Sequence, residues 1–159
     1  MRTFFAVLAA AAVASLLISA AAPAAGGGRV IRFLEVDQQR NDLYIDSDHN
    51  NTESAGDIFM GNFALYSWAK GGGRGQRIGH ARVMCTIRST SGSFCTGTFF
   101  IPGGSVVGEG FIRFSNAPIK IPVVGGTGAY AGARGTFTSR SIRDNSEVSL
   151  SADVIRLLP

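Results

Sequence analysis

The sequence predicts an all-β fold whose antiparallel strands form a closed barrel or a sandwich. Eight strand-like segments recur along the chain, and most are separated by Gly, Pro, Asn, Asp or Ser. No amphipathic helical pattern of ten or more residues follows the N-terminal segment. Closure into a barrel removes exposed sheet edges, and eight strands make about the smallest barrel that holds one small ligand. The predicted strands span residues 29–37, 57–68, 77–88, 94–101, 105–114, 119–124, 132–141 and 147–157.

The N-terminus has the pattern of a secretory signal peptide. A basic residue at position 2 precedes an alanine-rich apolar run over residues 3–21, and Ala22-Pro23-Ala24 offers small residues for cleavage. The alternative is an uncleaved membrane anchor, which the weak hydrophobicity of the alanine run disfavours. We therefore expect a signal peptide over 1–24, a flexible leader over 25–29 and one barrel domain over 30–159, in a secreted or periplasmic protein without stable membrane insertion.

The charge pattern argues against nucleic-acid binding. Removal of residues 1–24 leaves 14 basic and 11 acidic side chains, which is a mild excess. The basic residues are scattered and no two are adjacent, whereas nucleic-acid-binding surfaces cluster Lys and Arg. We expect no nucleic-acid partner.

The two cysteines are predicted to form a disulfide. In an exported chain, a pair of cysteines is more often bridged than reactive. A hairpin folded about Thr90 places Cys85 directly opposite Cys95, and the same register pairs Val83 with Gly97 and Ala81 with Phe99.

The first predicted strand carries two acids on an apolar face. Period-two alternation places Ile31, Phe33, Glu35 and Asp37 on one side of the strand. The two acids either lie in water beyond the barrel rim or point into the mouth of the cavity, where burial would raise their pKa and suit them to acid or base chemistry. Phe33 would then line the same cavity.

The segment between the first two predicted strands, residues 38–55, reads as a polar loop. Its acids, in Asp46-Ser47-Asp48-His49-Asn50, lack the central Gly and terminal Glu of the twelve-residue calcium loop, so we expect no metal. Asn50-Asn51-Thr52 is a glycosylation sequon, which has meaning only in a eukaryotic host.

A glycine-rich stretch, residues 122–135, follows the sixth predicted strand. Five of its fourteen residues are Gly, which indicates a sharp turn where backbones approach closely. It is not a phosphate-binding loop, because its glycine spacing departs from the dinucleotide fingerprint and no helical pattern follows.

Residues 121–135 resemble the Gly-Gly-(Thr/Ser)-Gly-x-(Phe/Tyr)-x-x-Ala-x-Gly signature of plant dirigent proteins and allene oxide cyclases. Pro122-Val123-Val124-Gly125-Gly126-Thr127-Gly128 is similar to the dirigent form, and Tyr130-Ala131-Gly132-Ala133-Arg134-Gly135 to the cyclase form. The resemblance implies an eight-stranded antiparallel barrel with a central apolar cavity, and a homotrimer by analogy.

The resemblance also implies site residues. Glu35 matches a functional Glu of the cyclases, whereas Asp37 stands where they have Asn. Gly56-Asp57-Ile58 and Leu65-Tyr66 match a further cyclase run, but its Asn falls on Phe63, so Asn62 could take that role only if a β-bulge turned it inward. Tyr130 either brings its phenol to the cavity or packs over the glycine turn. Gly79-His80-Ala81-Arg82 is similar to the dirigent Gly-Arg-Ala-Gln, which places His80 and Arg82 outside the barrel.

These observations leave three hypotheses for the function. The first is a cofactor-free barrel that binds a small apolar oxygenated molecule and steers its cyclisation or coupling, with Glu35 and Asp37 as acid or base and Phe33, Asn62 and Tyr130 as ligand contacts. The second is a non-catalytic ligand carrier, and the third is a structural or interaction protein whose barrel is filled by side chains. The small residues on the inner face of 77–88 favour a cavity.

Overall fold

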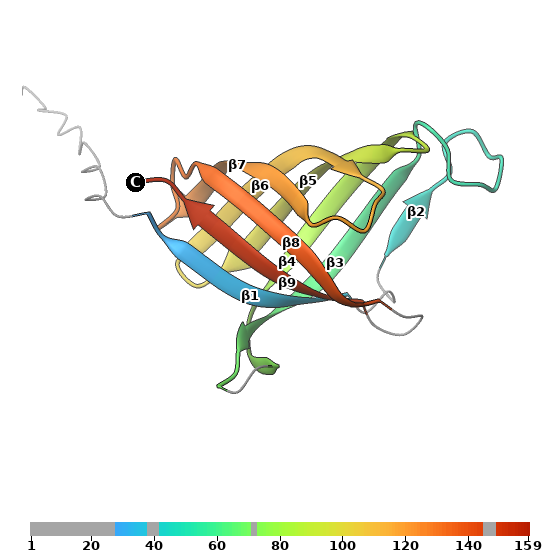
Figure 1. Cartoon of the computed structure of the whole chain (residues 1–159). Coiled ribbons are helices and arrows are strands. Elements are labelled where there is room, and N and C mark those ends of the chain that lie inside the picture. Colours follow the sequence, from blue (N-terminus) through green and yellow to red (C-terminus); the bar gives the residue numbers. More distant parts are fainter. Residues whose placement is uncertain (1–27, 38–41, 71–72, 145–148) are drawn as a thin grey trace, which may run out of the picture.

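The computed structural model describes residues 28–37, 42–70, 73–144 and 149–159, and within them it contains strands and no helix. All neighbouring strands are antiparallel, in the order β1-β9-β8-β7-β6-β5-β4-β3, and pairing of β1 with β3 closes the barrel (Figure 1). No helix among these residues is long and apolar enough to cross a membrane. The predicted signal peptide lies outside the described residues. The strands are β1 (Val30–Asp37), β2 (Leu43–Ile45), β3 (Ile58–Trp68), β4 (Arg74–Ser89), β5 (Gly92–Ile101), β6 (Gly104–Arg113), β7 (Ile119–Gly128), β8 (Gly135–Asp144) and β9 (Ser149–Leu157).

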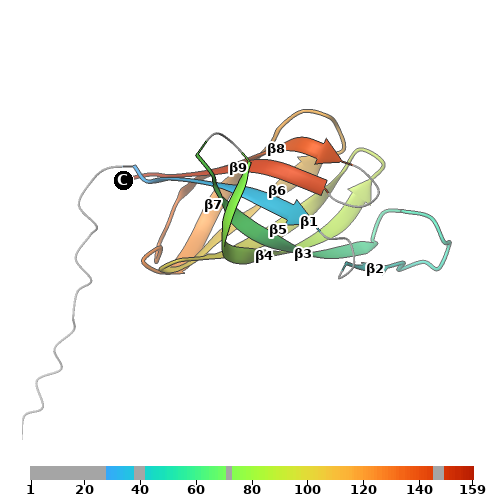
Figure 2. The same ribbon diagram turned by 90° about the horizontal axis from the view of Figure 1, so that it is seen from below.

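Eight of these strands form the barrel, as the sequence predicts, and β2 is an addition that the prediction missed. β2 falls inside the predicted polar loop and pairs with Ile58–Met60 of β3, beyond the stretch of β3 that pairs with β1. It therefore extends past the barrel, together with the loop that leads to β3 (Figures 1 and 2). Three residues form too short a strand for a periodicity argument to detect.

The glycine-rich stretch differs in part from its prediction, because β7 continues through Gly125, Gly126 and Gly128 instead of turning there. A Cβ added at Gly126 would lie 2.5 Å from the carbonyl oxygens of Ser105 and Tyr130, so the glycine lets the strand approach both segments. The turn comes just afterwards, where the Tyr130 N–H donates to the Thr127 carbonyl at 3.0 Å.

Aromatic side chains fill the centre of the barrel. Phe33, Phe99 and Phe137 are buried, and the Phe99 ring centroid lies 5.7 Å from that of Phe33 and 4.6 Å from that of Phe137. The small residues that the sequence places on β4 therefore face a packed aromatic cluster. The buried core comprises Phe33, Leu65, Ala81, Phe99, Ile101, Val106, Ile121, Val123, Tyr130, Phe137 and Ile155.

The predicted disulfide is confirmed. Cys85 is bonded to Cys95, their Cα atoms are 4.0 Å apart, and the strand register pairs Val83 with Gly97 and Ala81 with Phe99. Both cysteines point inward, and they are 9% and 2% exposed. The bridge ties β4 to β5 within the barrel wall.

Removal of this bridge is expected to destabilise the protein. The Cys85→Ala/Cys95→Ala variant should lose about 3 kcal/mol of unfolding free energy, because the cross-link restricts the unfolded chain over the ten-residue separation of the two cysteines. Urea unfolding measures the loss. A reducing agent should lower the urea midpoint of the wild type and leave that of the double variant unchanged. Equal midpoints for the wild type and the variant without reducing agent would contradict the prediction.

Candidate functional site

Two acidic side chains meet inside the barrel wall, Glu35 of β1 and Asp153 of β9. Asp153 is opposite Phe33 in the β1–β9 pairing and opposite Ser139 in the β8–β9 pairing. Directly paired residues point to the same face, and Phe33 is buried in the core, so Asp153 points into the barrel. Asp153 is 0% exposed, and Glu35 follows Phe33 by two residues on the same face.

Both carboxyl groups have a strong preference for the protonated form. Burial raises the pKa of Glu35 well above its ordinary value, and the neighbouring carboxyls of Asp153 and Asp37 raise it further. Burial likewise raises the pKa of Asp153 from 3.8 to about 7, although Ser139 and Glu35 offset part of this effect. Asp153, with a pKa of about 7, can therefore both donate and accept a proton near neutral pH.

The acid pair has unfilled hydrogen-bonding capacity. Glu35 Oε2 and both carboxylate oxygens of Asp153 are buried and have no hydrogen-bond partner of ordinary geometry among the described residues. Buried polar atoms are rarely left this way, because the loss of water is then uncompensated. Every Arg, Lys and His in the described part of the chain is exposed, so none of them accompanies the acids into the interior.

Two more acids extend the negative charge along the same end of the barrel. Asp37 ends β1 and contributes to the raised pKa of Glu35. Burial and the charge of Asp37 also raise the pKa of Asp42, which precedes β2, while the backbone N–H of Asn62 partly offsets the shift. Glu35, Asp37, Asp42 and Asp153 thus influence one another electrostatically.

A small cavity opens at the end of the barrel that carries the disulfide and β2. Its volume is about 190 Å³, and its walls are mostly apolar. Tyr44 of β2 pairs with Phe59 at its edge, and the Tyr44 hydroxyl donates to the Asp57 carboxylate at 2.5 Å. The lining residues are Tyr44, Glu53, Phe59, Cys85, Ile87, Ser93, Cys95, Ile112 and Phe114.

The structure separates the residues that the sequence proposed as ligand contacts. Phe33 lies beside the acid pair, as its face predicts. Tyr130 is buried over the glycine turn, where its hydroxyl donates to the Pro102 carbonyl at 3.0 Å and the Arg29 guanidinium lies 4.8 Å from its ring centroid. This is the packing alternative for Tyr130, near the start of β1 and away from Glu35 and Asp37 at the end of that strand.

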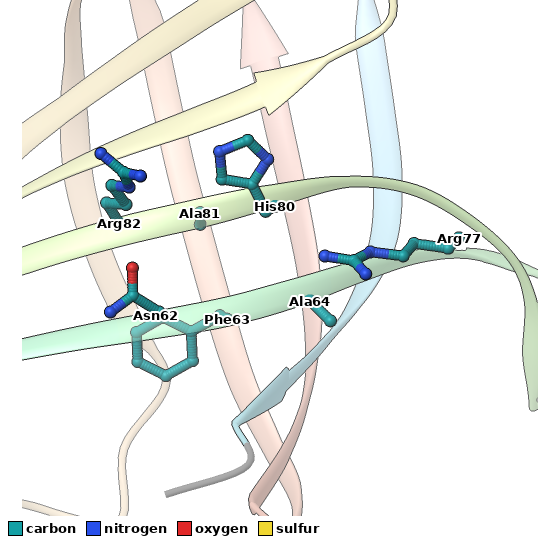
Figure 3. A pocket seen from close by; sticks show the side chains of 7 residues that line it. All are labelled: Asn62, Phe63, Ala64, Arg77, His80, Ala81 and Arg82. Atoms are coloured by element: carbon teal, nitrogen blue, oxygen red, sulfur yellow. The ribbon is translucent and has the colours of Figure 1, made fainter. Parts of the chain in front are cut away.

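Asn62 lies on the outer face of the barrel. The β3–β4 register continues unbroken from Ile58 to Leu65, so the bulge required to turn Asn62 inward is absent there. Asn62 is opposite Arg82, and both are exposed, as is His80. Figure 3 shows these three side chains on one side of β3 and β4, in a surface pocket of about 470 Å³. His80 stacks on Phe100 with ring centroids 4.6 Å apart, which agrees with its predicted outward placement.

The loop between β2 and β3 contains the described acids that come closest to a metal-binding arrangement. One carboxylate oxygen from each of Asp46, Asp48 and Asp57 lies within 4.8 Å of the others. The loop itself already supplies hydrogen-bond donors to these groups. Asn51 N–H donates to Asp46 at 2.7 Å, and the Ser47 and Ser54 N–H groups donate to Asp57 at 2.8 and 2.7 Å.

Replacement of Tyr44 by Phe is expected to raise the pKa of Asp57. The Tyr44 hydroxyl is the main cause that lowers this pKa from 3.8 to about 2, ahead of the loop N–H groups. The folded carboxylate is therefore favoured above pH 4 in the wild type, and this preference is lost as the pH falls through about 2. A carbon NMR titration of the Asp57 carboxyl measures the shift. Tyr66→Phe is the matched control, and an unchanged Asp57 pKa in Tyr44→Phe would refute the assignment.

The structure of this chain is similar to solved structures, whereas its sequence matches no known family. No protein-family model matches the sequence, and no curated protein is significantly similar to it. Its structure is similar to that of the pterocarpan synthase dirigent protein PsPTS1 at 15% identity, with a TM-score of 0.69 over 83% of this chain and 95% of that one. The chain has the dirigent and allene oxide cyclase-like barrel fold.

Two further solved structures with a similar barrel belong to proteins named for different reactions. Pyocyanin demethylase matches at 19% identity, with a TM-score of 0.61 over 81% of this chain and 99% of that one. The Diels-Alderase AbmU from Streptomyces koyangensis matches at 14% identity, with a TM-score of 0.59 over 86% and 72% of the two chains. At such identities the likeness establishes the fold and not the chemistry.

Sequence reasoning missed Asp153 and Ser139, although a signal for Asp153 was present. In the last strand Asp153, Ile155 and Leu157 are two residues apart, so period-two alternation places all three on one face, which is otherwise apolar. Ser139 shares its face with Phe137 in the same way. The opposition of Asp153 to β1 follows only from barrel closure and register.

Proposed function

We propose that this exported, dirigent-like barrel binds a small, largely apolar, oxygenated molecule beside the Glu35–Asp153 pair and steers its cyclisation or coupling. The observation that carries this proposal is a buried acid pair in an aromatic interior, in which Glu35 Oε2 and both Asp153 oxygens make no hydrogen bond of ordinary geometry among the described residues. Perturbed acids in an apolar interior are typical of functional sites. The structural neighbours include a pterocarpan synthase dirigent protein and Diels-Alderases, which supports the same class of reaction.

In the proposed reaction the barrel acts chiefly by positioning. The rigid strands that carry the acid pair hold the flexible molecule in a folded conformation at the acidic end of the barrel, which removes entropy from the cyclisation step. The protonated carboxyl of the acid pair donates a proton to a substrate oxygen on which negative charge develops. The other carboxylate then accepts a proton from the product, so that the pair again holds the number of protons with which it began. Exclusion of water protects the reactive intermediate. None of these steps requires a cofactor.

A non-catalytic ligand carrier is the second candidate. It is favoured by the modest cavity of about 190 Å³ at the disulfide end, which is smaller than a typical drug-sized pocket. The packed aromatic centre favours instead the third hypothesis, a barrel filled by side chains. A carrier would use the same acids to anchor a polar group without any proton transfer.

Native mass spectrometry of the mature protein, purified from the secretions of its host, tests the proposal. A co-purifying molecule of a few hundred daltons identifies the ligand class, and its open-chain precursor then becomes the substrate to assay. We expect Glu35→Gln to retain the fold and reduce turnover, whereas Glu109→Gln on the outer face should leave turnover unchanged. Binding without turnover in the wild type supports the carrier, and an empty protein that ignores added ligands overturns both candidates.

A further inference from the structure

We propose that the ligand of the acid site carries an organic cation, a protonated or quaternary nitrogen, which rests between Glu35 and Asp153 against the aromatic wall. This inference rests on the proposed function and specifies the chemical group that the site recognises. Its basis is the fully buried side chain of Asp153, which points into the barrel. Neither of its carboxylate oxygens makes a hydrogen bond of ordinary geometry among the described residues, although Ser139 and Glu35 lie close enough to lower its pKa.

The first step is the uncompensated acidity of the interior. Glu35 and Asp153 are neighbours in the interior. The charge of Asp37 raises the pKa of Glu35 and also that of Asp42. Buried acids in proteins normally have a basic partner or several donors. Here the Arg, Lys and His side chains of the described residues are all exposed, so none of them pairs with Glu35 or Asp153 in the interior. A cationic ligand supplies the missing partner, and an anionic ligand is repelled.

The second step concerns the kind of cation. A bound metal ion requires several carboxylate oxygens that converge on one point, and among the described residues only Asp46, Asp48 and Asp57 in the β2–β3 loop do so. The interior pair lacks this convergence. It borders instead on aromatic rings, since Phe33 is directly paired with Asp153 and its ring lies 5.7 Å from that of Phe99. Aromatic faces and carboxylates together suit a flat organic cation.

The third step is competition with protons. The empty site takes up protons more readily than exposed acids do, because burial disfavours ionised carboxylates. A cationic ligand must displace a proton, so its affinity should increase as the pH rises. The titratable groups involved are Glu35 and Asp37 on β1, Asp153 on β9, and Asp42 before β2. The other walls present non-titrating side chains, Ser139 on β8 and Leu65 on β3.

The test compares three probes of nearly equal shape: benzamidinium, benzamide and benzoate. NMR titration of the isotope-labelled mature protein measures affinity and locates the contacts. We expect benzamidinium to bind at least about tenfold more tightly than benzamide, which corresponds to about 1.4 kcal/mol. It should shift the Asp153 and Glu35 resonances, and benzoate should not bind. Calorimetry in buffers of different ionisation enthalpy should show release of about one proton, and tighter binding at higher pH.

Variants assign the effect to the acid pair. Asp153→Asn and Glu35→Gln should each lose most of the preference for benzamidinium over benzamide, and Glu109→Gln should retain it. Equal binding of benzamide and benzamidinium, or a preference that survives Asp153→Asn, would overturn the inference. So would the absence of binding by all three probes.

The outcomes also separate this inference from the proposed function. If benzamide binds at the acid pair as tightly as benzamidinium, the site accepts small molecules and the proposed function stands, but the cationic group is wrong. The same conclusion follows if a native ligand identified by mass spectrometry lacks a cationic nitrogen and still binds in a Glu35-dependent way: the proposed function stands and the cationic group is wrong. If benzamidinium binds and no conversion of any native ligand is found, the cation site stands and the cyclisation proposal fails.

Discussion

Phe99→Ala should be the most destabilising single substitution in the barrel centre, with a loss of about 3–5 kcal/mol of unfolding free energy. The Phe99 side chain is 2% exposed and contacts aromatic rings from β1 and β8, so it links strands that are distant along the barrel wall. Its removal loses the burial of a large ring and leaves a void among Phe33, Phe137 and Val106, which rigid neighbouring strands can fill only in part. Urea unfolding followed by tryptophan fluorescence and circular dichroism measures the effect.

Phe100→Ala is the matched control for this prediction. Phe100 is the next residue along β5, points to the outer face, is 37% exposed and stacks on His80. Its truncation removes one surface stacking contact and should cost about 1 kcal/mol or less. If the two substitutions destabilised the protein equally, the assignment of inner and outer faces on β5 would be wrong, and with it the aromatic filling of the barrel.

The same alternation explains why so much of the fold could be predicted. A barrel wall separates core from solvent, so each strand shows its inward face in the sequence as a period-two pattern. The hairpin that pairs Cys85 with Cys95 was predictable because its register follows from a short local turn. The eight predicted barrel strands match those of the structure with modest shifts at their ends.

What could not be predicted depends on contacts between distant parts of the chain. The extension of β7 through Gly126 follows from pairing with β6 and from contact with the Tyr130 turn, whereas glycine in isolation favours a turn. The position of Asn62 was left conditional on a bulge, and bulges are set by the neighbouring strand. Alternation alone places Asp153 on an apolar face, but its proximity to Glu35 follows only when β9 is placed beside β1.

The separation of the predicted ligand contacts changes how the site is understood. The first functional hypothesis gathered Glu35, Asp37, Asn62 and Tyr130 around one cavity. The described structure instead gathers acids from β1 and β9, leaves Asn62 outside and shows the packing alternative for Tyr130. Packing at the Tyr130 turn and acidity at the other end give the barrel a filled end and a polar end.

Asp153→Asn should stabilise the protein at alkaline pH and remove part of its pH dependence. The pKa of Asp153 is raised from 3.8 to about 7 in the fold, so between these values the folded protein holds a proton that the unfolded chain has released. The stability that the protonated group contributes is complete below about pH 4 and is lost as the pH rises through about 7. The upper limit of this loss is about 4 kcal/mol, from 1.36 kcal/mol per pKa unit. Urea unfolding at several values between about pH 4 and 8 measures it.

The coupling between the two acids makes this result specific. Glu35→Gln removes the carboxyl that interacts with Asp153, so it should shift the pH at which stability decreases. Asp153→Asn should instead reduce the size of that decrease. In the double variant the remaining pH dependence should be that of the other acids, which include Asp42 and Asp57. If Asp153→Asn were as pH-sensitive as the wild type, the acid would be solvated in the folded protein. If instead it were less stable than the wild type at every pH, its carboxylate would have partners that offset burial, and the interior would have no unmatched charge for a ligand to neutralise.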